Sequence, residues 1–188
     1  MTLDFTIHTS EARERTVDRL GIADAAYKYG LAVDIIGNNP APKTGADPAL
    51  AEAAALMAQA LTPDAQLRLF LAGPSGPSQP MGSGGPAEVA AAVRAYFSAY
   101  GYVGTQHSVS NVRIAFTGPD RAAGTCQIPC FHWLSDQRML LAPVSYQDEF
   151  VRSDGVWKIS KRDVFAMRFW VAEGYAPDPL DPSLTRPA

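Results

Sequence analysis

Residues 104–114, GTQHSVSNVRI, contain polar side chains of the types that acid–base chemistry uses. If this stretch is a β-strand, its alternation places His107, Val109 and Asn111 on one face. An imidazole and a carboxamide would then face the same space, one to move protons and the other to form hydrogen bonds. The alternative is a partly buried structural histidine, because histidine is often found at intermediate burial. The choice depends on what else in the chain could face His107.

A carboxylate on an apolar helix face is the second unusual feature. Residues 17–36 show helical periodicity, with Thr16 as the expected N-cap. The face that should be buried carries Leu20, Ala23, Tyr27, Gly30 and Asp34. A buried carboxylate needs a hydrogen-bonding partner or a raised pKa. Asp34 is therefore more informative than an ordinary surface aspartate.

The overall composition describes an ordinary globular protein. The chain has 188 residues, 47% hydrophobic and 19% charged, which suits one domain with a sizeable core. A formal net charge of -3 and the lack of a Lys/Arg cluster give no reason to expect a nucleic-acid partner. No apolar run approaches the roughly 18 residues of a membrane span. The N-terminal residues lack the basic start and apolar core of a signal peptide, so a cytoplasmic location is the expectation.

No motif for a cofactor or a metal is found. Cys126 and Cys130 lie four residues apart in an expected strand, roughly 13 Å along it and too far for a disulfide. Their spacing to His132 is not one that zinc sites use. There is no phosphate-binding glycine loop and no G-x-S-x-G nucleophile turn. Any catalysis is expected to use side-chain acids and bases alone, with no cofactor and no metal.

The elements that would position these residues come in two blocks. A second helix should follow Asp47-Pro48 and a third should begin at Pro86, because proline fits the first turn of a helix. Four strands are then expected at residues 105–116, 121–133, 139–152 and 156–169, joined by short turns. Helices first and a long antiparallel sheet afterwards is an α+β layout, and such long strands suggest strong curvature. We divide the chain into a lead-in (1–15), one domain (16–170) and a proline-rich tail (171–188).

The order of these motifs resembles a known superfamily. The motifs are YxxxxxxD (Tyr27 and Asp34), LMAQALTPDA, GPAEVAAAVRAYF, HSVSN and DGVWKISKRDV. Together they resemble the SnoaL-like branch of the nuclear transport factor 2-like superfamily over about residues 16–170. That branch includes scytalone dehydratase, hexachlorocyclohexane dehydrochlorinase and polyketide cyclases. The resemblance implies a cone-shaped α+β barrel, in which three N-terminal helices close a strongly curved antiparallel sheet around a deep apolar pocket.

The resemblance also implies roles for individual residues. In the dehydratase and the dehydrochlorinase an Asp on the first helix pairs with a His on the sheet, and Asp34 and His107 match these positions. Such a carboxylate would fix the tautomer of the imidazole and make it a better base, although the pair could also be purely structural. Tyr27 could stabilise an oxyanion or be a core aromatic. His132, on the next strand, could be a proton donor if it faces inward.

The remaining candidates are substrate-binding residues. Asn111 shares the expected face of His107, and Trp133, Tyr146 and Phe165 are candidate pocket walls. Arg162 could supply a positive charge at the rim or could simply be solvated. The Gly/Pro/Ser-rich residues 73–86 could be a lid or a tolerated insertion.

These features lead to one hypothesis with two alternatives. We expect a cofactor-independent lyase or isomerase, acting by elimination or a double-bond shift on a small apolar, aromatic substrate. The alternatives are a non-catalytic accessory subunit of an aromatic-ring dioxygenase and a module that binds a hydrophobic ligand without turnover. We also expect a homodimer or homotrimer, because the outer face of an open curved sheet needs cover.

Overall fold

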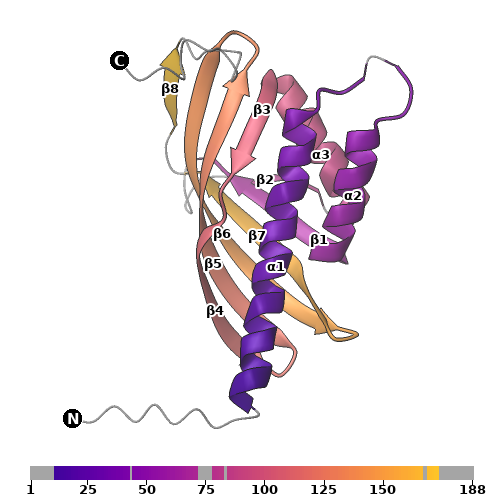
Figure 1. Cartoon of the computed structure of the whole chain (residues 1–188), viewed down its shortest axis with the longest axis vertical. Helices are drawn as coiled ribbons and strands as arrows, with labels where there is room; N and C mark the ends of the chain where they lie inside the picture. The colour runs from indigo at the N-terminus through magenta and orange to yellow at the C-terminus, as the bar shows by residue number, and fades with distance from the viewer. Residues whose placement is uncertain (1–10, 43, 72–77, 83, 167–168, 174–188) are drawn as a thin grey trace, which may run out of the picture.

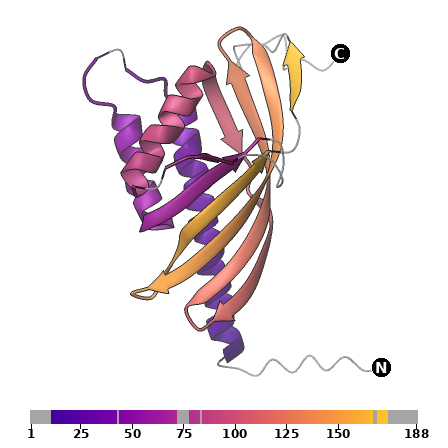
Figure 2. The same cartoon turned by 180° about the vertical axis from the view of Figure 1, so that it is seen from behind.

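Three helices cover one face of a strongly curled sheet of eight strands (Figure 1). The computed structural model describes residues 11–42, 44–71, 78–82, 84–166 and 169–173. The opposite face of the sheet carries no helix among these residues, as the view from behind shows (Figure 2). This arrangement confirms the predicted cone-like α+β class. Within the described residues, no helix is long and apolar enough to cross a membrane.

The second and third helices begin where their sequence signals predicted. Helix α2 spans Pro48–Ala60, and the Asp47 side chain accepts a hydrogen bond of 2.9 Å from the backbone N–H of Leu50. Helix α3 spans Pro86–Ala99. It follows Gly85, whose φ of 96° is a conformation that only glycine adopts easily.

The first helix differs from the prediction in both its start and its buried side. Helix α1 spans Glu11–Asn38, so it begins inside the expected lead-in and before Thr16. Leu20 and Tyr27, expected to be buried, are 66% and 51% exposed. The buried side instead carries Ile22, Ala25, Tyr29, Val33 and Ile36. Because this helix has apolar residues on two sides, its periodicity did not identify the side that packs on the sheet.

The sheet is mixed and not purely antiparallel. Its strands are β1 (Leu61–Phe70), β2 (Ser78–Pro80), β3 (Tyr102–His107), β4 (Ser110–Gly118), β5 (Arg121–Leu134), β6 (Arg138–Ser153), β7 (Val156–Ala166) and β8 (Trp170–Glu173). The predicted hairpins correspond to β5, β6 and β7, which pair antiparallel. Strand β1 pairs parallel with β7. Parallel neighbours need a long crossover connection, and the chain between these two strands contains α3 and five strands of the sheet.

The predicted strand that carries His107 is two strands. Strand β3 ends at His107 and β4 begins at Ser110, and both pair with β5. Asn111 has a φ of 50°, and the pairing of β4 with β5 shifts register between Ser110 and Arg113. This irregularity interrupts the alternation on which the shared face of His107 and Asn111 was predicted.

Candidate active site

Asp34 and His107 form a hydrogen-bonded pair between α1 and the end of β3. His107 Nδ1 lies 2.6 Å from Asp34 Oδ1, and the two side chains are 7% and 19% exposed for His107 and Asp34 respectively. The backbone N–H of His107 donates to the other carboxylate oxygen at 2.9 Å. Because a carboxylate accepts hydrogen bonds, the imidazole proton belongs on Nδ1. Nε2 is then left with a free lone pair and can act as a base.

Thr105 adds a third hydrogen bond to this carboxylate. Its Oγ1 donates to Asp34 Oδ1 at 2.9 Å, and Thr105 itself is only 2% exposed. Alternation along β3 places Thr105 and His107 on the same face, so one strand provides three donors to one carboxylate. Sequence reasoning did not identify Thr105. The signal that could have found it is its position two residues before the histidine.

The C-terminal end of α1 is hydrogen-bonded to strand β3. Asn38 Nδ2 donates to the carbonyl of Thr105 at 2.8 Å, and Asn38 Oδ1 accepts from the Thr105 N–H at 3.0 Å. Beside this pair, a Cβ placed on Gly37 would lie 2.1 Å from Thr105 Oγ1. Glycine therefore permits the close approach that brings Asp34 within reach of His107.

The histidine of this pair lines an apolar cavity between the helices and the sheet. Other lining residues include Val33, Phe97, Tyr102, Cys130, His132 and Tyr146. The cavity volume is about 70 Å³. Typical ligand pockets are roughly 300–1,000 Å³. A one-ring ligand would therefore have to displace side chains, so this cavity favours small substrates.

His132 faces the cavity, which the sequence left open, and its surroundings keep it neutral. It is 7% exposed, its ring stacks on Tyr102 with centroids 4.5 Å apart, and it lies edge-on to His107 at 5.3 Å. Burial, with a smaller contribution from the charge of His107, lowers the pKa of His132 to about 3. Its Nδ1 is buried and has no hydrogen-bond partner in the part of the chain that the structure describes. The predicted proton-donor role therefore needs correction, because a neutral imidazole offers a polar N–H and not an imidazolium proton.

Arg162 is in the core and not at the rim. It is 0% exposed, and its Nε and Nη2 donate to the two oxygens of Asp148 at 2.8 and 2.7 Å. Burial alone would lower the pKa of Arg162, but the charge and hydrogen bonds of Asp148 outweigh it and raise that pKa. The sequence did not show that Asp148 would be its partner, since the two residues lie on neighbouring strands.

Four other predicted site residues lie outside the cavity. Tyr27 is exposed on the outer side of α1, and Asn111 is exposed and donates to Gln127 Oε1 at 2.7 Å. Trp133 follows His132 directly in β5 and so lies on the other face of the sheet. Phe165 lies between Val164 and Ala166, which line the cavity, and stacks instead on Phe70 at 4.7 Å. Of the predicted wall residues, Tyr146 lines the cavity.

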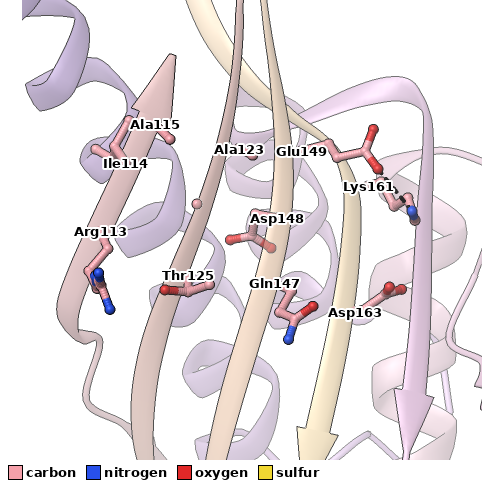
Figure 3. Close-up of a pocket in the computed structure, with 11 residues that line it drawn as sticks. Arg113, Ile114, Ala115, Ala123, Thr125, Gln147, Asp148, Glu149, Lys161 and Asp163 are labelled. Atoms are coloured by element: carbon pink, nitrogen blue, oxygen red, sulfur yellow. Dashed lines mark hydrogen bonds and ion pairs between the residues drawn. The ribbon is translucent and has the colours of Figure 1, made fainter. Parts of the chain in front are cut away.

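A larger hollow of about 500 Å³ lies on the outer face of the sheet (Figure 3), and neither Asp34 nor His107 lines it. Arg113, Thr125, Gln147 and Asp163 line it from four neighbouring strands. Lys161 pairs with Glu149 at 2.9 Å, and Asp163 pairs with Arg68 at 2.6 Å. These charges neutralise each other at the surface, and the Asp34–His107 pair does not face this hollow. The smaller internal cavity is therefore the candidate active site.

The chain is similar to known proteins both in sequence family and in fold. The SnoaL-like domain family matches residues 49–163. No curated protein matches the chain in sequence. A type 2 hexachlorocyclohexane dehydrochlorinase (LinA) is similar in structure, with a TM-score of 0.65 and 22% identity over 92% of this chain and 99% of that chain. The type 3 enzyme from Novosphingobium barchaimii has a TM-score of 0.68 and 21% identity over 90% of this chain and 99% of that chain.

A candidate scytalone dehydratase from Novosphingobium aromaticivorans has a TM-score of 0.61 and 18% identity, over 90% of this chain and 97% of that chain. At these identities the structural likeness establishes the fold. The family match extends over more than half of the chain, from α2 to β7. The chain belongs to the SnoaL-like domain family.

Proposed function

We propose that this protein is a cofactor-independent lyase or isomerase in which His107 is the base. The observation that carries the proposal is the 2.6 Å contact between His107 Nδ1 and Asp34 Oδ1 beside an apolar cavity. It leaves Nε2 as the free nitrogen of a ring that lines the cavity. Similar folds in a dehydrochlorinase and a candidate dehydratase support a reaction of the elimination type.

The proposed step moves one proton and one pair of electrons. His107 Nε2 takes a proton from a substrate carbon, and the C–H electron pair becomes the new double bond. In an elimination, the leaving group departs from the neighbouring carbon with its own electron pair. In an isomerisation, the same proton returns to a different carbon. Asp34 stabilises the imidazolium that forms in either case, because its carboxylate accepts the hydrogen bond from Nδ1.

The cavity lining supports a small, largely apolar substrate. Side chains of Val33, Leu69, Val93, Phe97 and Val144 contribute to the walls. Such walls exclude water, and a low local dielectric strengthens the interaction between the carboxylate and the imidazolium. We propose a one-ring aromatic or similarly compact compound, because even one ring has to displace side chains in a cavity of about 70 Å³.

The test is turnover of a panel of halogenated, hydroxylated and carbonyl-bearing one-ring compounds in D₂O, followed by NMR. Wild-type protein should eliminate, or exchange a C–H proton of, at least one compound. His107→Ala should lose essentially all of this activity. Asp34→Asn should lose about a hundredfold or more, since acid–base groups contribute roughly 10²–10⁴. Tyr27→Phe is the matched control, because Tyr27 lies on the same helix but outside the cavity, and it should retain full activity.

Contrary outcomes would point to the non-catalytic alternatives. A folded His107→Ala variant with wild-type turnover would show that the pair is structural. If the wild type binds panel compounds but converts none, a ligand-binding module would replace the enzyme hypothesis. An accessory subunit would instead show itself by forming a complex with a larger oxygenase chain.

A further inference from the structure

Two phenols that line the cavity, those of Tyr29 and Tyr146, have no hydrogen-bond partner in the part of the chain that the structure describes. Tyr29 on α1 and Tyr146 on β6 are 2% and 3% exposed, and both line the cavity. Neither hydroxyl makes a hydrogen bond to any residue that the structure describes. A buried polar group without a partner costs free energy, so such groups in native proteins usually meet water or a ligand.

The guanidinium of Arg162 lies against both phenol rings and favours their role as hydrogen-bond donors. The guanidinium carbon of Arg162 lies 4.3 Å from the ring centroid of Tyr29 and 4.1 Å from that of Tyr146. The two rings meet edge to face at 6.0 Å, so they form a corner with Arg162 against both rings. Burial raises the pKa of both tyrosines, to about 12 for Tyr29, so both stay protonated at neutral pH. The positive charge of Arg162 opposes this rise in both cases, which makes each O–H a stronger hydrogen-bond donor.

The phenols and the catalytic pair lie at different depths of one cavity. Ala142 on β6 is in register with Cys130, which is in register with His107. Tyr146 lies four residues further along β6, a distance of roughly 13 Å along the strand. Tyr29 precedes Asp34 by five residues on α1, roughly 7.5 Å along the helix. The offset of Tyr146 along β6 and the offset of Tyr29 along α1 both point toward the N-terminal end of α1 (Figure 1).

We propose that Tyr29 and Tyr146 form an oxygen-recognition subsite, and that the substrate carries a carbonyl or other oxygen acceptor at the end remote from His107. This inference rests on the proposed function for its second half, because a ligand held by the phenols would present its other end to the base. The subsite selects an oxygenated compound over a hydrocarbon or a haloalkane of equal size. Two neutral O–H donors beside a buried guanidinium also stabilise negative charge that develops on such an oxygen during proton removal.

A matched pair of probes tests the subsite without knowledge of the substrate. Acetophenone and α-methylstyrene have the same shape, but only the ketone can accept a hydrogen bond. Calorimetric titration should show that wild-type protein binds acetophenone at least tenfold more tightly. Tyr29→Phe and Tyr146→Phe should each weaken acetophenone binding by about 3- to 10-fold, as expected for one net hydrogen bond, and should leave α-methylstyrene binding unchanged. The infrared C=O stretch of bound acetophenone should move to lower frequency in the wild type and less in each variant.

Two control variants distinguish oxygen binding by Tyr29 and Tyr146 from oxygen binding elsewhere in the cavity. Tyr96→Phe removes a third phenol of the same cavity, one that already has Tyr100 as a hydrogen-bond partner, and it should not change the preference. His107→Ala should keep the preference for the ketone even where turnover is lost. If His107→Ala abolishes the preference, the oxygen sits at the catalytic pair and the subsite proposal is wrong. Equal binding of the two probes by the wild type, or no binding of acetophenone, would also overturn it.

Folding of the variants can be checked in the same experiment. Each Tyr→Phe change keeps the ring that packs on Arg162, and it removes a hydroxyl that has no partner among the described residues. We therefore expect the melting temperature to stay the same or rise. A clear fall would mean that the hydroxyl has an internal partner, which contradicts the basis of the subsite.

Discussion

The two histidines of the cavity have opposite electrostatic surroundings. His107 contacts a carboxylate, whereas His132 lies against aromatic rings and the other histidine. The second arrangement disfavours an imidazolium, because burial among these rings deprives a charged ring of solvent. One cavity therefore offers a group that can accept a proton and a neutral polar group beside it.

This difference predicts how stability depends on pH. The pKa of His132 is about 3 in the folded protein, against 6.5 for an ordinary histidine. A lowered folded-state pKa stabilises the fold fully above pH 6.5, and this contribution is lost as the pH falls from 6.5 toward 3. The loss is about 1.4 kcal/mol per pH unit, or about 2 kcal/mol at pH 5. His132→Gln should therefore lose about 2 kcal/mol less unfolding free energy than wild type between pH 7 and pH 5, measured by urea titration.

An NMR titration checks the same assignment directly. The imidazole signals of His132 should stay those of the neutral ring down to pH 4.5. A midpoint above pH 5.5 would contradict the neutral assignment and restore His132 as an imidazolium acid.

At the scale of elements, the site depends on how closely α1 approaches β3. Asn38 binds the backbone of Thr105 from the end of the helix, and Gly37 leaves the space that the threonine side chain fills. Asp34 lies one turn earlier on the same helix. A change in the distance between helix and strand would therefore change the geometry of the Asp34–His107 pair.

Gly37→Ala should damage both stability and activity. The new Cβ would start 2.1 Å from Thr105 Oγ1, so α1 or β3 must shift. Overpacking of this kind typically costs about 1–3 kcal/mol, and we expect at least a tenfold loss of any His107-dependent turnover. Gly118→Ala is the control, since its Cβ would meet Arg121 at an ordinary 3.7 Å. If chemical denaturation shows equal stability for the two variants, the close approach does not constrain the site.

At the scale of the whole molecule, the face of the sheet that no described helix covers carries an apolar patch. Its members are Phe131, Trp133, Met139, Leu141 and Trp170. They lie side by side across β5, β6 and β8, where Trp133 is in register with Met139, and Leu141 with both Phe131 and Trp170. A contiguous patch of this kind on a soluble protein usually marks an interaction surface.

We propose that a second copy of the chain covers this patch, in a homodimer or homotrimer. The hollow on the same face carries Arg113, which has no partner among the described residues, whereas Glu149 and Asp163 already pair with Lys161 and Arg68. A second copy that covers this face would supply a partner for Arg113. Light scattering at micromolar concentration should show two or three times 20.1 kDa.

Leu141→Lys should shift the protein toward the monomer, because it places a charge in the centre of the patch. Leu20→Lys is the control, since Leu20 is exposed on the outer side of α1 and distant from the patch. A wild-type protein that scatters as a 20.1 kDa monomer would contradict the proposal.

Local chemistry was sufficient to predict most of the elements. Proline after a capping residue marked the start of α2, and turn residues between alternating segments marked β5, β6 and β7. The pairing of Asp34 with His107 was predicted from motif resemblance, and the structure places the two in contact. Such features depend on neighbours within a few residues, or on a pattern that the family shares.

Other features were decided only by packing between distant segments. Helix α1 has apolar residues on two sides, and contact with the sheet selected the side with Tyr29 over the side with Tyr27. The chain leaves strand geometry between β3 and β4, and Asn111 therefore does not face the cavity with His107. The alternation of residue types in the sequence continues through this break and gave no sign of it. Arg162 and Asp148 are buried together because neighbouring strands bring their charges into register, and a buried charge is tolerated only when it is paired. The sequence by itself determined where most helices and strands form, but the side of each element that faces the cavity depends on long-range contacts that no local pattern contains.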